Sequence, residues 1–106
     1  MGFFDFLFGK KQAQNVDFKQ LAKDGALILD VRTKEEFDAG HIDGAVNIPV
    51  QVIEQHLDEI RNYNKKMVIA YCRSGRRSGN ATNILNKANI KTVNGGGFED
   101  LKKILA

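Results

Sequence analysis

The pattern of hydrophobic and polar positions alternates along the chain between segments typical of strands and segments typical of helices. Short apolar runs are typical of buried strands and predict strands at residues 26–31 and 66–71. Two shorter strands are predicted at residues 45–48 and 90–93. Apolar residues three or four positions apart predict longer helices, at residues 50–62, from near Arg77 to Ala88, and at 98–105. Strands that alternate with helices form a parallel sheet covered by helices on both faces. The predicted fold class is therefore α/β.

Residues that begin or end helices and strands support this division. Asp17 can cap a short helix that runs to about residue 23, and Gly25 can end it. One or two helical turns at residues 34–38 would stop at Gly40, and Pro49 would end the second strand. The three consecutive glycines at residues 95–97 predict a turn before the last helix.

The length of 106 residues allows one compact domain. With 42% hydrophobic and 27% charged residues, the composition is that of an ordinary globular chain and argues against disorder. We assign residues 15–106 to this domain and residues 1–14 to an apolar N-terminal tail or anchor.

The first eight residues contain four of the seven phenylalanines. The segment lacks a basic leading region, and Asp5 breaks its apolar run, so we do not expect a signal peptide. We also expect no N-myristoylation, because that signal requires Ser or Thr at the position of Phe6. Membrane contact through residues 3–8 is an alternative, but we favour a packed turn or exposed tail because so few apolar residues bind membranes only marginally.

Charge and cysteine content narrow the range of partners. Sixteen Lys and Arg are offset by thirteen Asp and Glu spread along the chain, so we expect no surface suited to nucleic acid. Only Arg73, Arg76 and Arg77 cluster closely, and a patch of this size fits a small anionic substrate. The single cysteine excludes an intrachain disulfide, and a reducing, cytoplasmic setting is the default.

That cysteine, Cys72, directly follows the apolar run at 66–71, at the end of a parallel strand where ligands bind in α/β sheets. A tight loop containing Gly75 then leads into a helix. Successive N–H groups of such a loop, the helix N-terminus and the nearby arginines can lower a thiol pKa from its ordinary value of about 8.5. We therefore expect a nucleophilic thiolate that needs no histidine base. An inert buried thiol fits poorly, because three arginines and a glycine are among the next five residues.

Three ordered motifs in this sequence resemble those of the rhodanese family. They are Asp30-Val31-Arg32 with Glu36-Phe37, Gly40-His41-Ile42 and Gly44-Ala45-Val46-Asn47-Ile48-Pro49; then Cys72-Arg73-Ser74-Gly75-Arg76-Arg77-Ser78; then Gly95-Gly96-Gly97-Phe98. The resemblance covers the chain from about residue 15 to 105. One departure is Leu101, where many members have tryptophan, and it affects the expected packing near the C-terminus.

The resemblance implies a sulfurtransferase of the thiosulfate type, with no metal and no cofactor. The Cys72 thiolate would attack the outer sulfur of a donor such as thiosulfate, and the resulting persulfide would pass its sulfur to a thiol or to cyanide. Arg73 and Arg76 would orient the anionic donor, and the N–H groups from Arg73 through Ser74 and Gly75 to Ser78 would hold the persulfide. The acceptor would be a small thiol or a thioredoxin-like protein.

Other residues are expected to support this loop. Arg77 would turn inward against a carboxylate, with Asp30 and Glu36 as candidates, and Ser78 would cap the next helix or donate to the sulfur. We expect Asp30 and Arg32 to form a buried or half-buried hydrogen-bonded pair. His41 lies in the first motif, where the family uses this position structurally, so we do not assign it as a base.

Two other kinds of function remain open. Phosphatases and arsenate reductases of the same fold have five residues between the cysteine and the arginine, whereas four separate Cys72 from Arg77. The smaller loop suits one sulfur atom better than a tetrahedral oxyanion. Many rhodanese-like domains are non-catalytic binding or signalling modules that have lost the cysteine, which this chain keeps.

Overall fold

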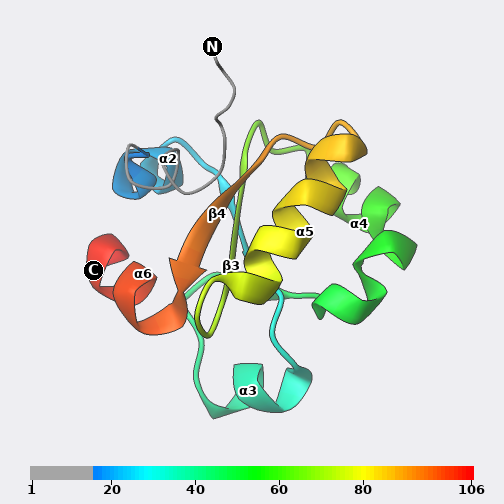
Figure 1. The fold of residues 1–106 in the computed structure, drawn as a ribbon. Helices are drawn as coiled ribbons and strands as arrows, with labels where there is room; N and C mark the ends of the chain where they lie inside the picture. The colour runs from blue at the N-terminus through cyan, green and yellow to red at the C-terminus, as the bar shows by residue number, and fades with distance from the viewer. Residues whose placement is uncertain (1–15) are drawn as a thin grey trace.

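A parallel sheet of four strands, in the order β2-β1-β3-β4, forms the centre of the computed structural model, which describes residues 16–106 (Figure 1). The strands are β1 (Leu27–Asp30), β2 (Val46–Asn47), β3 (Val68–Cys72) and β4 (Thr92–Gly97). Each neighbouring pair is parallel. The predicted α/β class with a parallel sheet is confirmed.

Helices cover both faces of this sheet. They are α2 (Phe18–Lys23), α3 (Lys34–Ala39), the 3₁₀ helix η1 (Val50–Gln55), α4 (Leu57–Asn62), α5 (Arg76–Lys87) and α6 (Phe98–Leu105). One face packs against α5, η1 and α4, and the other packs against α2 and α6. The short helix α3 lies beyond the carboxyl ends of the strands (Figure 1).

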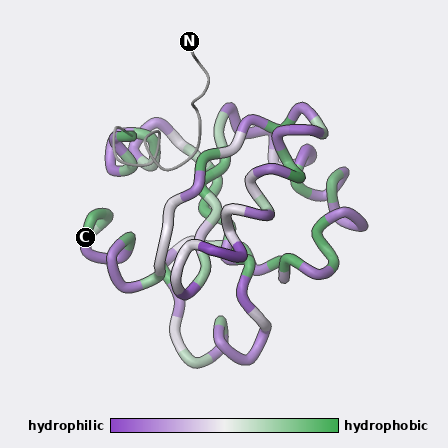
Figure 2. The backbone as a smooth tube through the Cα atoms, in the orientation of Figure 1, coloured by the Kyte–Doolittle hydropathy of each residue, from purple (hydrophilic) through white to green (hydrophobic). Residues whose placement is uncertain are grey.

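Strand β3 supplies residues to both halves of the core, and all five of its residues are buried. Val68, Ala70 and Cys72 belong to the cluster under α5, whereas Ile69 and Tyr71 belong to the cluster under α2 and α6. This is the alternation of side chains expected along a strand. Both faces of the sheet are covered, so the central strands carry apolar side chains on each, in agreement with their hydrophobic colouring in Figure 2. The alternation directs the Cys72 side chain towards α5.

The predicted helix boundaries near the N-terminus are confirmed. Asp17 accepts a hydrogen bond from the Gln20 N–H at 3.0 Å and so caps α2. Helix α3 ends at Gly40, as predicted.

The amphipathic helix predicted over residues 50–62 is wrong in one respect, because the segment is divided at His56. The first part is the 3₁₀ helix η1, and the α-helix α4 begins only at Leu57. Three of the first four residues, Val50, Val52 and Ile53, are β-branched, which lowers α-helix propensity. The apolar spacing is nevertheless used, since Ile53 and Ile60 are both buried.

The strand predicted at 90–93 and the turn predicted at 95–97 are also corrected. Strand β4 runs from Thr92 to Gly97, so the glycines form its second half. A bulge leaves Gly95 unpaired, because Ala70 pairs with Asn94 while the next residue, Tyr71, pairs with Gly96. A Cβ atom on Gly95 would lie 2.7 Å from Ile69 Cγ2, so this glycine is required by close packing rather than by a turn.

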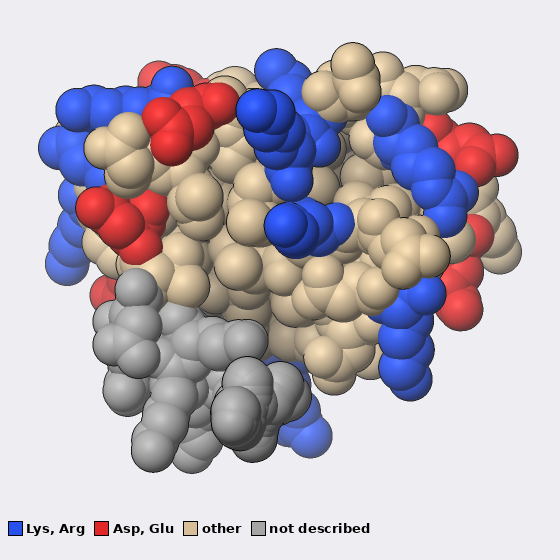
Figure 3. Space-filling model, turned by 90° about the horizontal axis from the view of Figure 1, so that it is seen from above, with Lys and Arg blue, Asp and Glu red and all other residues tan. Residues whose placement is uncertain are grey.

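The remaining predictions concern the N-terminal tail, contact with a membrane and the distribution of charge on the surface. The tail assigned to residues 1–14 and the alternative of membrane contact through residues 3–8 fall outside the described residues. None of the described helices is long and apolar enough to cross a membrane. On the end of the molecule opposite α3, basic side chains are interspersed with acidic and uncharged ones (Figure 3).

Candidate active site

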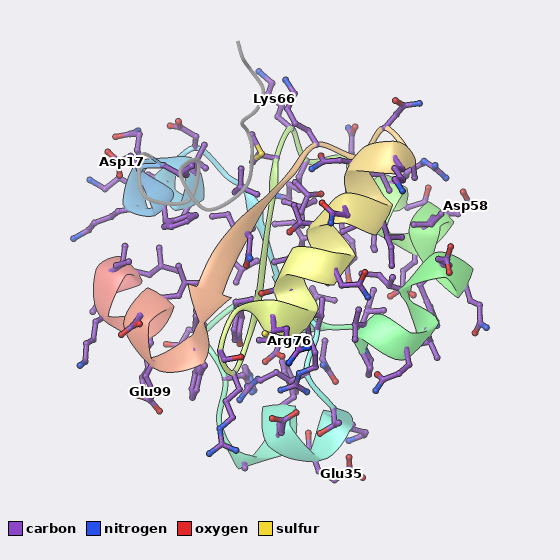
Figure 4. The ribbon with its side chains drawn as sticks, in the orientation of Figure 1. Asp17, Glu35, Asp58, Lys66, Arg76 and Glu99 are labelled. Atoms are coloured by element: carbon purple, nitrogen blue, oxygen red, sulfur yellow. The ribbon has the colours of Figure 1, made fainter. Side chains whose placement is uncertain are left out.

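The loop after β3 places Cys72 at the N-terminus of α5. Cys72 is the last residue of β3, and α5 begins at Arg76, one residue earlier than predicted. Gly75 has a φ of +97° as the residue before the helix, and a Cβ atom there would lie 3.3 Å from Gly96 Cα. Glycine is therefore required for both its conformation and its space. Figure 4 shows Arg76 at this end of α5, on the side of the molecule where α3 lies.

Three hydrogen bonds converge on the Cys72 sulfur. The Gly75 N–H donates to Sγ at 3.0 Å, and the N–H and Oγ of Ser78 each lie 3.4 Å from it. Cys72 and Ser78 are both fully buried. The predicted anion nest thus has its donors at the end of the loop and in the first turn of α5. Of the two roles expected for Ser78, contact with the sulfur is the one observed.

Burial and hydrogen bonding shift the pKa of the Cys72 thiol in opposite directions. Burial is the largest single influence and raises the pKa of the Cys72 thiol. The hydrogen bonds from the Ser78 side chain and from the N–H groups of Ser78, Ser74 and Gly75 outweigh it together. The thiol pKa therefore lies below its ordinary value, which favours the thiolate.

Arg77 turns away from solvent and pairs with Glu36, as predicted, whereas Asp30 does not take part. The guanidinium donates to both carboxylate oxygens, at 2.8 and 3.1 Å. Glu36 also accepts hydrogen bonds from the N–H and Oγ1 of Thr33, and with these it closes the capping box of α3. The hydrogen bond from Arg77 is the main reason that the pKa of Glu36 falls to about 2.

Arg73 and Arg76 differ from Arg77 in being exposed. Neither forms an ion pair with any residue in the range 16–106. Both belong to the segment that directly follows the buried Cys72, and no carboxylate of residues 16–106 pairs with them.

Asp30 and Arg32 form the expected buried pair, but on the other side of the sheet from Cys72. Arg32 Nη2 lies 2.6 Å from Asp30 Oδ2 and 2.7 Å from the Gly40 oxygen. The guanidinium is 4.5 Å from the ring centre of Phe98, a residue of the α2 and α6 face. The pair holds the end of β1 to the segment after α3. It makes no hydrogen bond with the Cys72 loop.

The contacts of His41 are with Phe37 of α3 and not with the Cys72 loop. Its Nδ1 lies 2.8 Å from the Phe37 oxygen, and its ring stacks on the Phe37 ring with 3.6 Å between centroids. These contacts favour the structural role expected for it.

One residue at the site was missed by the sequence analysis. Asn94 of β4 accepts a hydrogen bond from Ser78 Oγ at 2.7 Å and donates to the Gly75 oxygen at 3.0 Å. It follows the strand predicted at 90–93, so its place at the carboxyl end of a strand beside β3 was a usable signal. No motif drew attention to it.

Comparison with known proteins agrees with this geometry. The sequence model of the rhodanese-like domain matches residues 14–103. The chain belongs to the rhodanese-like domain family. The thiosulfate sulfurtransferase PspE of Escherichia coli is 34% identical over 74 residues, which are 69% of this chain and 71% of that protein. The uncharacterized protein YqhL of Bacillus subtilis is 45% identical over 62 residues, or 58% of this chain, which spans about half of that protein (48%).

A solved structure described as a rhodanese with anions, from E. coli, has the same rhodanese-like fold. Its TM-score is 0.66 at 31% identity, over 72% of this chain and 91% of that chain. The fold is thus that of a rhodanese-like domain.

Proposed function

We propose that this chain is a sulfurtransferase that carries one sulfane sulfur as a persulfide on Cys72. The observation that carries the proposal is the convergence of the Gly75 N–H and both donors of Ser78 on the buried Cys72 sulfur. Preorganised donors of this kind stabilise a negative charge on sulfur without needing to reorganise during the reaction.

The reaction proceeds through two displacements at sulfur. The Cys72 thiolate attacks the outer sulfur of thiosulfate and forms a new S–S bond. The original S–S bond of the donor breaks, and sulfite leaves with its electron pair. A thiolate acceptor or cyanide then attacks the outer sulfur of the persulfide, and Cys72 leaves again as a thiolate. No oxidant or proton donor is needed to balance either step.

Arg73 and Arg76 are proposed to bind the donor. Both are exposed and have no ion pair with the described residues, so a small anion can approach them without displacing a protein carboxylate. A similar protein is named a thiosulfate sulfurtransferase, which supports thiosulfate as the probe donor. We propose a small thiol or a thioredoxin-like protein as acceptor, in a reducing cytoplasm.

The pairing of Arg77 argues against a phosphatase or an arsenate reductase. An oxyanion at Cys72 would need the arginine that closes the loop, but Arg77 is bound through two hydrogen bonds to Glu36. The loop is also one residue shorter than in those enzymes. Both observations favour transfer of a single sulfur atom.

Intact-protein mass spectrometry after incubation with thiosulfate tests the proposal directly. We expect one added sulfur atom that cyanide removes, and none in Cys72→Ser. A folded wild-type protein that gains no sulfur from thiosulfate, and releases no thiocyanate with cyanide, would instead support a non-catalytic module.

A further inference from the structure

The Ser78 hydroxyl faces two acceptors but has only one proton to donate. Its oxygen lies 3.4 Å from Cys72 Sγ and 2.7 Å from Asn94 Oδ1. Sulfur accepts over longer distances than oxygen, so both acceptors are within reach. The hydroxyl must therefore choose between them.

The orientation of the Asn94 side chain is fixed by two backbone groups. Its Nδ2 donates to the Gly75 oxygen at 3.0 Å, and its Oδ1 accepts from the Gly96 N–H at 2.9 Å. A flipped amide would place oxygen against oxygen at Gly75 and donor against donor at Gly96. The group that meets Ser78 is thus an acceptor, and it cannot turn away. Close packing adds to this, since a Cβ atom on Gly79 would lie 3.3 Å from Asn94 Nδ2.

We propose that Asn94 is a positioning residue that competes with the Cys72 sulfur for the hydroxyl proton of Ser78. When Cys72 is a thiol or a persulfide, Sγ carries no full negative charge and the hydroxyl donates to Asn94. When Cys72 is a thiolate, the hydroxyl rotates and donates to Sγ. Asn94 Oδ1 then keeps only its bond from the Gly96 N–H.

This exchange suits the reaction proposed above, on which its functional meaning rests. The charge on Sγ disappears in the first half of the transfer, when the persulfide forms, and reappears in the second half, when the acceptor takes the sulfur. A buried hydroxyl without an acceptor is costly, and Asn94 provides that acceptor whenever the sulfur does not. The Ser78 donor therefore remains satisfied in both forms of the enzyme.

Charged groups near the sulfur also influence its ionisation and must be held constant in a test. Arg77 of α5 interacts with Cys72 and is paired with Glu36 of α3. Arg73 and Arg76 complete the charges of the loop. None of these is altered in the variants below, so their influence cancels in the comparison.

The test measures how much the Ser78 hydroxyl lowers the thiol pKa in three backgrounds. Cys72 is the only cysteine in the chain, so the pH dependence of thiol alkylation by a neutral reagent reports its titration alone. The contribution of the hydroxyl is the rise in pKa caused by Ser78→Ala. It is measured with Asn94, with Asn94→Leu, which removes the competing acceptor, and with Asn94→Asp, which strengthens it.

We expect the contribution to increase by about half a pKa unit in Asn94→Leu and to decrease by a similar amount in Asn94→Asp. Asn94→Asp adds a charge and also places an oxygen against the Gly75 oxygen, to which Asn94 Nδ2 donates. Both changes, like any general change in the loop, are present with and without Ser78→Ala and so cancel in the difference. Should the leucine variant fail to fold, the nearly isosteric aspartate variant carries the test alone.

An equal contribution of the hydroxyl in every folded background would overturn the proposal and leave Asn94 as a loop support only. This outcome is independent of sulfur transfer, because the titration needs no donor. A protein that lacks sulfurtransferase activity but shows the expected change would contradict the proposed function and keep this inference.

Discussion

Arg77 in the first turn of α5 and Glu36 in the first turn of α3 form a two-point ion pair, although 41 residues separate them in the chain. Glu36 also closes the capping box of its own helix. One carboxylate thus joins the start of α3 to the loop that surrounds Cys72. The ion pair should therefore affect both the stability of the fold and the pH dependence of that stability.

Glu36→Gln should lower the free energy of unfolding by about 1–2 kcal/mol, because it removes the charge of a half-buried pair but keeps a hydrogen-bonding side chain. Urea unfolding measures the change. Glu35→Gln is the matched control, since it removes a charge from the same turn of α3 at an exposed position. Equal effects of the two variants would contradict a special contribution from the pair.

The pH dependence of stability should also reflect Glu36. Its pKa is about 2 in the folded protein against an ordinary value of 4.5, so the unfolded chain takes up its proton first as the pH falls. The stability from the pair is therefore present above about pH 5 and is lost as the pH decreases towards about 2. Urea unfolding between these values should show a shallower decline for Glu36→Gln than for the wild type. Parallel declines would show that the pair does not shift this titration.

The double variant Arg73→Gln, Arg76→Gln should raise the KM for thiosulfate about tenfold or more while raising the thiol pKa only slightly. The groups nearest the sulfur are the N–H groups of Gly75 and Ser78, which the variant retains. Kinetics at two salt concentrations and the pH dependence of Cys72 alkylation by a neutral reagent measure the two effects.

Lys65→Gln, Lys66→Gln is the matched control for this variant. It also removes two positive charges, but near the opposite end of β3, where Figure 4 shows Lys66 far from Arg76. The control should change neither quantity. If the double arginine variant instead titrates as a free thiol with an unchanged KM, side-chain charge rather than the backbone activates Cys72.

Gly95→Ala should destabilise the fold by about 1–3 kcal/mol. The added methyl group would lie 2.7 Å from Ile69 Cγ2 and 3.0 Å from Leu101 Cδ2, inside the packed core. Thermal unfolding measures the loss. Gly25→Ala is a contrasting variant: Gly25 has a φ of +95° and no atom within 4 Å of the added carbon, so its loss comes from conformation, whereas Gly95 has no positive φ and its loss comes from packing. A Gly95→Ala protein as stable as the wild type would show that the core yields at no cost.

The sequence was sufficient to predict the sheet where strands are continuous apolar runs, as in β1 and β3. It was insufficient for the second half of β4, because Gly95, Gly96 and Gly97 carry no hydrophobic signal and resemble a turn. The break at His56 was missed for a related reason: apolar spacing is satisfied by η1 followed by α4 as well as by one helix. In each case tertiary packing selects among local conformations that the pattern allows.

The site was predictable to a similar extent. The Cys72 loop is contiguous, so its geometry follows from a strand, a glycine and a helix start. The choice of Glu36 over Asp30 as the partner of Arg77 depends on tertiary structure: Asp30 is paired with Arg32 on the other side of the sheet, whereas α3 places Glu36 beside the loop. The role of Asn94 depends on the register between β3 and β4, which includes a bulge, and no local pattern encodes that register.

The bulge at Gly95 has a consequence for how this protein tolerates changes in length. Gly97 lies so close to the loop that a Cβ atom would be 2.6 Å from the Arg73 oxygen. Deleting any one of the three glycines would remove the extra residue, and with it the local bend and twist that the bulge gives β4 beside the loop. Natural relatives that share this packing should therefore keep both the number of residues at the bulge and a glycine at the position of Gly95. Strand length is as much a determinant of the reactive sulfur's surroundings as any side chain.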